Sequence, residues 1–328
     1  MIFMPNIKHE KMNNIYNIKY KTDAQVHEFR RYLKKIFKNH YFSNHWEFAM
    51  ALEAELANIT ENKHNITYMN SSVALISLLH ILAMDGEGDI IVSKGVSLYP
   101  WVKSSLEYFG KDINQGGEQE SKEDDIFISI EMAFAETRMK PARPDRTIVI
   151  PATLKCHEKM YNECIFVYDM SEETCFGAST GAFVSTNDED IADKLRWMRS
   201  SYGRTGSVSV PINGNGRFSE MQAAEALSVI RCDGVKDTII EKINSGMLSK
   251  LNIENIPHDF IGSEYTGGII KLMVPDHDVN EMITRLNNIH LLYEIEPGLD
   301  DISEVLIRVP LGETSRTALL VILNSITR

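Results

Sequence analysis

The chain has 328 residues, of which 43% are apolar and 24% charged, and its formal net charge is −12. These values are typical of a soluble globular protein with one large and one smaller domain. The acidic balance argues against a nucleic-acid partner and against anionic lipid, because both require a basic surface. No apolar run is long enough to cross a bilayer and residues 1–8 lack a signal-peptide pattern, so we expect a cytoplasmic protein.

Hydrophobic periodicity in the first two thirds of the chain predicts alternating strands and helices, and therefore a mainly parallel sheet covered on both faces. Residues 1–22 are expected to form a loose arm. The predicted helices are 23–39, 46–56, 73–84, 104–109, 191–199 and 219–230, and the predicted strands are 67–69, 89–93, 126–131, 147–151, 165–169 and 181–186. The first helix is expected to be amphipathic, with Val26, Phe29, Leu33 and Phe37 near one face. The polar, acidic residues 111–125 predict a surface loop.

The last third of the chain predicts a smaller α+β domain. The expected helices there are 235–251, 277–288 and 313–326, and the expected strands are 268–274 and 304–309. We therefore expect an N-terminal arm at 1–22, a large α/β domain at 23–230 and a small domain at 231–328. The four cysteines, Cys156, Cys164, Cys175 and Cys232, have no C-x-x-C spacing, which predicts reduced thiols and no zinc site.

Two polar segments follow predicted strands, where open α/β sheets bind their ligands. Asn70-Ser71-Ser72 lies at a strand-to-helix junction, where free N–H groups can hold an anion; the alternative is a simple helix cap. Asp169 ends an apolar strand, where a carboxylate can hold a protonated ring nitrogen; the alternative is a turn aspartate. Glu172 follows on the same turn, as a general base or as a solvated acid.

Two more segments carry weaker signals of the same kind. Tyr99 follows a predicted strand and is suited either to stacking on a flat ring or to core packing. The loop 213–217 contains two glycines and opens a predicted helix. Its backbone is suited to a phosphate, and a plain flexible turn is the alternative.

The order of these segments resembles the DegT/StrS-type nucleotide-sugar aminotransferases, which bind pyridoxal phosphate (PLP) and have the aspartate aminotransferase fold. The similar segments, each with the family pattern, are Phe42-Ser-Asn-His45 (F-S-N-H), Leu52-Glu-Ala-Glu-Leu56-Ala (L-E-x-x-L-A), Asn70-Ser-Ser72-Val73-Ala-Leu (N-G-T-A-A-L), Ser97-Leu-Tyr99 (F-T-F/W), Asp169-Met-Ser-Glu172 (D-A-A-Q), Thr180-Gly-Ala-Phe-Val-Ser-Thr-Asn-Asp188 (G-G-A-V-V-T-N-D), Leu195-Arg-x-x-Arg199, and Asn215-Gly-Arg217-Phe-Ser219-Glu220-Met-Gln (N-Y-R-M-S-E-x-Q). The resemblance covers about residues 40–230 and fades beyond them.

This resemblance implies a PLP-dependent transferase of fold type I, with a large cofactor-binding domain and a smaller C-terminal one. It implies that Ser72, with the adjoining Val73, binds the cofactor phosphate, and that Asn215 reaches the phosphate of the neighbouring subunit in a dimer. It further implies that Tyr99 stacks on the pyridine ring and Asp169 holds its nitrogen. Glu172 takes the place of the family's glutamine. The implied substrate is a nucleotide-linked sugar.

One departure from the family pattern concerns catalysis directly. The family places S-F-x-x-x-K between D-A-A-Q and G-G-A, but here these segments nearly touch, and no lysine occurs between Lys159 and Lys194. The Schiff-base lysine is thus deleted with its segment, and PLP or pyridoxamine phosphate (PMP) is expected to bind non-covalently, if it binds. A positioned acid–base group contributes a factor of about 10²–10⁴ in rate, so transamination loses a proton shuttle.

Three hypotheses follow from the retained motifs and the missing lysine. The first is an enzyme of amino-sugar or polysaccharide biosynthesis that uses the cofactor with an unusual base. The second is a catalytically inactive homologue that pairs with a lysine-bearing paralogue and donates Asn215 across the interface. The third is a binding or regulatory module that has lost the cofactor.

Overall fold

The computed structural model describes the central part of the chain and several outlying elements. The described residues are 22–42, 45–84, 86, 88–93, 95, 98–109, 113–115, 124–130, 143–151, 163–171, 174, 176, 178–200, 210, 214–233, 269–288, 293–297 and 302–308. Outside these ranges lie residues 1–21 of the arm predicted at 1–22, the predicted helices 235–251 and 313–326, and the candidate Glu172.

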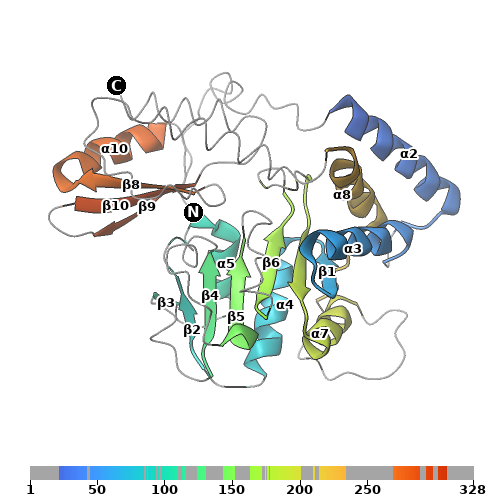
Figure 1. The fold of residues 1–328 in the computed structure, drawn as a ribbon, viewed down its shortest axis with the longest axis horizontal. Coiled ribbons are helices and arrows are strands. Elements are labelled where there is room, and N and C mark those ends of the chain that lie inside the picture. Colours follow the sequence, from blue (N-terminus) through green and yellow to red (C-terminus); the bar gives the residue numbers. More distant parts are fainter. Residues whose placement is uncertain are drawn as a thin grey trace.

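A seven-stranded sheet forms the centre of the molecule (Figure 1), in the order β1-β7-β6-β5-β4-β2-β3. Its strands are β1 (His64–Tyr68), β2 (Ile90–Val92), β3 (Ile113–Gln115), β4 (Ile126–Ile130), β5 (Thr147–Ile150), β6 (Ile165–Asp169) and β7 (Ala182–Thr186). Strands β3, β2, β4, β5 and β6 pair in parallel, whereas β7 is antiparallel to both β6 and β1. Among the described strands of this sheet, β7 alone is therefore reversed, which confirms the predicted mainly parallel architecture.

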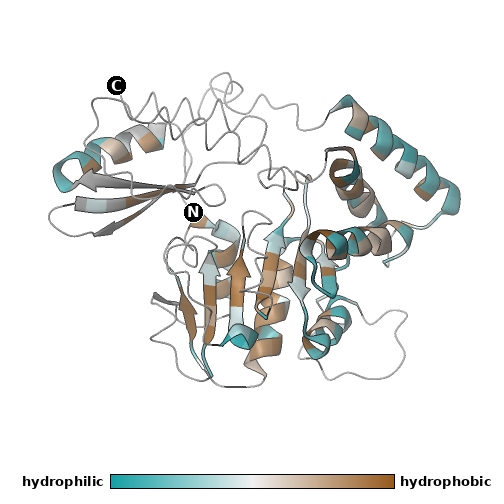
Figure 2. Ribbon diagram, in the orientation of Figure 1, coloured by the Kyte–Doolittle hydropathy of each residue, from teal (hydrophilic) through white to brown (hydrophobic). Residues whose placement is uncertain are grey.

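Helices cover both faces of this sheet because the strands are apolar on both sides. The helices are α2 (Asp23–Asn39), α3 (Glu47–Thr60), α4 (Ser71–Ala83), α5 (Pro100–Phe109), α7 (Glu189–Arg199) and α8 (Glu220–Asp233). In β6, Ile165 and Val167 pack with α4, α5 and α7, whereas Phe166 and Tyr168 pack with α2, α3 and α8. Figure 2 shows the resulting brown strands and the mostly teal α2 on the outside.

The predicted helices and strands of this part of the chain match the observed ones to within a few residues, with two exceptions. The short strand β3 lies inside the predicted loop 111–125. On α2, Tyr32 and Ile36 are buried and Phe29 and Leu33 are partly buried, but Phe37 is 56% exposed. Phe37, which the sequence puts on the apolar face, therefore lies outside the buried face of α2, where Tyr32 and Ile36 pack against the core.

A second, three-stranded antiparallel sheet lies later in the chain, in the order β8-β10-β9. It consists of β8 (Ile269–Pro275), β9 (Tyr293–Pro297) and β10 (Ile302–Arg308), with α10 (Asp276–Asn288) between β8 and β9. Strand β9 was not predicted, whereas β8, β10 and α10 were. No helix in the described ranges has the length and apolar character needed to span a membrane.

Candidate functional site

The sheet brings three of the predicted segments to one edge. Strands β1, β2, β4, β5 and β6 run in the same direction, so their C-terminal ends share an edge with the start of the reversed β7. Helix α4 begins just after β1, Tyr99 follows β2, and Asp169 ends β6 opposite Ala182 of β7. This edge is where open α/β sheets bind ligands.

The N-terminus of α4 is capped by its own chain. Asn70 is the N-cap residue, and its side chain accepts a hydrogen bond of 2.9 Å from the N–H of Val73. This confirms the helix-cap interpretation of Asn70. No described residue accepts from the N–H groups of Ser71 or Ser72, so this end of α4 keeps two donors and the positive end of the helix dipole for an anion.

Asp169 lies directly beside this helix end. The Ser71 hydroxyl donates to Asp169 Oδ1 at 2.9 Å. Ser171 donates twice, from its N–H to Oδ1 at 3.1 Å and from its hydroxyl to Oδ2 at 2.9 Å. The Ser171 contacts form the local turn that was the alternative interpretation of Asp169. The Ser71 contact, however, links the carboxylate across the sheet edge to α4.

The connection between β6 and β7 occupies the place where the family pattern has its lysine-bearing segment. The N–H of Met170 donates to the carbonyl of Gly181 at 3.0 Å, and the N–H of Ala178 donates to the carbonyl of Met170 at 2.9 Å. Met170, Phe176 and Ala178 are buried. The N–H of Ser179 donates to Glu225 of α8 at 3.3 Å. The described part of this connection is therefore closed on itself and packed into the core.

The segment before α8 crosses the start of α4. The N–H of Met69 donates to the carbonyl of Gly216 at 3.0 Å. A Cβ atom on Gly216 would lie 2.7 Å from Val73 Cγ1 and 2.8 Å from Tyr68 Cδ1, so only glycine fits this crossing. Asn215 beside it is exposed and has a φ of 46°. The structure thus brings Ser72, Val73, Asp169 and the Asn215 segment to one neighbourhood.

Tyr99, which the resemblance assigns to stacking on the cofactor ring, is buried in the core. Its side chain is 6% exposed and lies edge-on to Trp101, with ring centroids 6.4 Å apart. It belongs to the core cluster under α4 and α5. Core packing is therefore observed for Tyr99, and its stacking on a cofactor ring stays a prediction.

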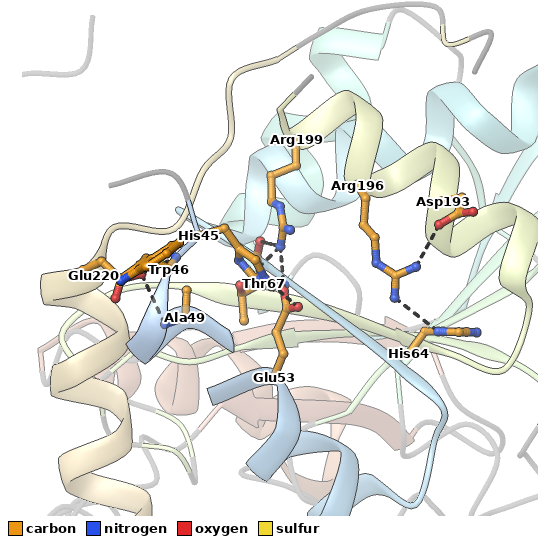
Figure 3. A network of polar contacts seen from close by, with 10 residues as sticks. All are labelled: His45, Trp46, Ala49, Glu53, His64, Thr67, Asp193, Arg196, Arg199 and Glu220. Carbon is orange, nitrogen blue, oxygen red and sulfur yellow. Dashed lines mark hydrogen bonds and ion pairs between the residues drawn. The ribbon is translucent and has the colours of Figure 1, made fainter. Parts of the chain in front are cut away.

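Several residues of the family-like motifs hold the scaffold around the site. Glu53 of α3 accepts from Arg199 Nη1 at 2.6 Å and from the Thr67 N–H at 2.9 Å, and His45 Nε2 lies 3.0 Å from its other oxygen. Figure 3 shows these side chains converging between α3, β1 and α7. Burial alone would raise the pKa of Glu53, but Arg199, His45 and the Thr67 N–H together lower that pKa to about 2.

A second pair in Figure 3 joins the other end of β1 to α7. Arg196 Nη2 lies 3.2 Å from His64 Nδ1, and Arg196 also contacts Asp193 at 2.9 Å. Burial and the adjacent Arg196 charge both lower the pKa of His64, which favours the neutral form of the imidazole.

Glu220 caps a helix that is distant from it in the sequence. Helix α3 has no side-chain cap of its own at Trp46. Glu220, the first residue of α8, accepts instead from the N–H groups of Trp46 and Phe48, both at 2.7 Å. Helix α8 itself begins with the predicted serine cap, because Ser219 and Gln222 exchange hydrogen bonds of 3.1 Å.

This architecture is that of the PLP-dependent aminotransferases of fold type I, as comparison with solved structures shows. No protein-family model and no curated protein matches the sequence. PseC of Helicobacter pylori, an aminotransferase of pseudoaminic acid biosynthesis, matches with a TM-score of 0.61 at 12% identity, covering 91% of this chain and 96% of PseC.

Two other neighbours were solved with a bound cofactor or in the presence of a product. NtdA of Bacillus subtilis, with bound PMP, has a TM-score of 0.59 at 11% identity and covers 94% of this chain and 83% of NtdA. DesI, studied with its TDP-sugar product, has a TM-score of 0.64 at 12% identity and covers 92% of this chain and 91% of DesI. At these identities the matches establish the fold, which confirms the fold expected from the DegT/StrS resemblance.

Proposed function

We propose that this chain is a sugar-aminotransferase-like protein of nucleotide-sugar or polysaccharide biosynthesis that binds PMP or PLP without a covalent bond. The observation that carries the proposal is the contact between Ser71 and Asp169, which places a carboxylate beside the N-terminus of α4. The PMP in NtdA and the TDP-sugar product in DesI support the choice of ligands.

The residues at this edge fit the cofactor in two respects. A carboxylate suits the protonated nitrogen of a pyridine ring, and the N–H groups of Ser71 and Ser72 suit a phosphate. The crossing at Gly216 lets backbone approach the same helix end. The chain does not fit a covalently bound cofactor, because the sequence has no lysine between Lys159 and Lys194, where the family pattern has its Schiff-base lysine.

The proposed roles follow the chemistry of each side chain. Bound PMP or PLP supplies an electron sink for reactions at an amino-bearing carbon. Asp169 keeps the ring nitrogen protonated, Tyr99 stacks on the ring, and Ser72 binds the phosphate together with Asn215 of the neighbouring subunit. Glu172 is the candidate for moving a proton at the reacting carbon. The assembly is a homodimer or a heterodimer with a lysine-bearing paralogue.

A ligand titration tests this proposal. Purified protein is titrated with PMP and with PLP while absorbance is recorded, and saturable binding of at least one is expected. Asp169→Asn should weaken that binding more than tenfold, because the charge-assisted bond to the ring nitrogen is lost. Asp190→Asn is the matched control, since Asp190 lies on α7 with a side chain that is 72% exposed. Absence of saturable binding by the wild-type protein would overturn the proposal.

The packed β6–β7 connection favours a second candidate, a catalytically inactive subunit. Met170, Phe176 and Ala178 fill the core in the place of a lysine-bearing segment. Such a subunit would support a lysine-bearing paralogue by lending Asn215 to its site. No turnover of a nucleotide-linked keto-sugar alone, with activity restored on mixing with the paralogue and lost again with Asn215→Ala, would establish this role over the first.

A further inference from the structure

Two departures from the family-like motifs converge on one carboxylate. Ser71 stands where the pattern N-G-T has glycine, and Ser171 stands where D-A-A-Q has its second alanine. Neither glycine nor alanine can donate a side-chain hydrogen bond. Here both hydroxyls donate to Asp169, at 2.9 Å each.

These contacts leave the Asp169 carboxylate able to accept one more hydrogen bond. An ionised carboxylate has about four acceptor positions, two on each oxygen. On Asp169, Oδ1 accepts from the Ser71 hydroxyl and the Ser171 N–H, and Oδ2 accepts from the Ser171 hydroxyl. Among the residues that the structure describes, no other donor reaches Asp169, so one position on Oδ2 remains.

The two serines also fix the direction in which that position points. Ser71 is 6% exposed and is anchored in the first turn of α4, which packs against the sheet. Ser171 is held by the turn in which the Thr174 N–H and hydroxyl both donate to its carbonyl, at 3.0 and 2.8 Å. Asp169 is therefore gripped from two elements. A side chain with supported hydrogen bonds loses less freedom when a ligand binds.

We infer that Ser71 and Ser171 are positioning residues that clamp Asp169 so that Oδ2 offers a single acceptor to a ring N–H of the bound cofactor. The inference rests on the proposed function and deepens it, because it assigns a task to two residues that the family pattern lacks. In a chain without the Schiff-base lysine, the contact with the ring nitrogen contributes a larger part of the free energy of cofactor binding. The two serines keep Asp169 Oδ2 oriented toward the ring nitrogen.

The test separates orientation of Asp169 from a merely structural role. Binding of PMP and of its 1-deaza analogue, which has carbon in place of the ring nitrogen, is measured by calorimetry for wild type, Ser71→Ala and Ser171→Ala. We expect each variant to bind PMP about fivefold to tenfold more weakly, as for the loss of one hydrogen bond. Binding of the deaza analogue should not change, because it makes no bond to Oδ2.

Ser228→Ala is the control for loss of a buried hydroxyl. Ser228 is fully buried in α8, and its hydroxyl donates at 2.6 Å to the carbonyl of Glu225 in the same helix. This variant should bind both ligands as the wild type does. An equal loss for PMP and the deaza analogue in the Ser71 and Ser171 variants would overturn the clamp while leaving the proposed function intact. Failure of the wild-type protein to bind PMP would overturn both.

Discussion

The Arg199 guanidinium lies 2.6 Å from Glu53 Oε1, and this pair joins α7 to α3 across the end of β1. Arg199 is 5% exposed at its side chain and Glu53 17%. Both residues belong to segments that carry the family resemblance. Some residues of the family-like motifs therefore stabilise the packing of helices and strands rather than bind a ligand.

The Glu53 carboxylate should make stability depend on acid pH. Its pKa is about 2 in the folded chain and 4.5 as a free side chain. A lowered pKa contributes stability that is present above pH 4.5 and is lost as the pH falls toward 2. We expect urea unfolding to show a steep loss of stability between pH 5 and pH 3. In Glu53→Gln this slope should be shallower and stability at pH 7 lower by about 3 kcal/mol, because Arg199 stays buried without its partner.

The choice of pH range and control makes this test specific. The pKa of His64 is lowered from 6.5, so its proton uptake on unfolding acts mainly above the range used for Glu53. Glu107→Gln is the control, because Glu107 is 61% exposed at its side chain and only 4.0 Å from Lys103. If the stability of Glu53→Gln depends on pH between 5 and 3 as steeply as that of the wild type, the lowered pKa of Glu53 would be contradicted.

Glu220 should contribute to stability by capping α3. Glu220 is 1% exposed and its carboxylate accepts from two N–H groups at 2.7 Å, so removal of this side chain leaves those N–H groups of α3 without their acceptor. We expect Glu220→Ala to lower the free energy of unfolding by about 2–3 kcal/mol and Glu220→Gln by about half of that. Chemical denaturation measures both. Met221→Ala, at a neighbouring position that is 41% exposed, is the control. Equal stability of the alanine variants at 220 and 221 would rule out the cap.

The sequence predicts features that depend on local pattern and misses those that depend on a distant partner. The apolar strands and the serine cap of α8 are local, and they were found. The contact of Glu220 with Phe48 joins residues 172 positions apart, and nothing near either residue indicates the other. Phe37 continues the predicted apolar face of α2, but the buried apolar residues of this helix are Tyr32 and Ile36, whose partners are distant in the sequence.

The candidate site shows the same division. Asp169 ends one strand and Ser72 follows another, so the rule that ligands bind at the C-terminal ends of parallel strands predicts that both lie at one edge. Ser71 was seen only as part of a helix start, since its contact with Asp169 spans 98 positions. The family resemblance predicts the roles of motif residues that match the family pattern. Ser71 and Ser171 depart from that pattern, and only their observed contacts with Asp169 indicate a role for them. Tyr99 is buried in the core. The presence of a tyrosine after a strand does not by itself distinguish a core residue from one that stacks on a ligand.

Gly216 should tolerate no side chain. An alanine Cβ there would lie 2.7 Å from Val73 Cγ1 and 2.8 Å from Tyr68, which is held by the bond from its hydroxyl to the Leu195 carbonyl at 2.8 Å. We expect Gly216→Ala to cost about 1–3 kcal/mol of stability, as overpacking does, and to weaken PMP binding by displacing the start of α4. Gly214→Ala is the matched control, because its Cβ would lie 4.0 Å from the nearest atom. Thermal unfolding of the two variants gives the comparison, and similar values for both would contradict the crowding at Gly216.

Reduction with borohydride should attach no cofactor to a lysine of the site. The β6–β7 connection has no lysine, and Lys194, the next along the chain, lies on α7 beside Asp190 at 2.7 Å. A stoichiometric amount of PLP is added, the sample is reduced, and lysine-bearing peptides are compared by mass spectrometry with a lysine-bearing enzyme of the same fold treated in parallel. We expect one full equivalent on one lysine of that enzyme, and in this chain only traces spread over surface lysines. One full equivalent on a single lysine here would show that an amine from elsewhere reaches the site, and non-covalent binding would then be wrong.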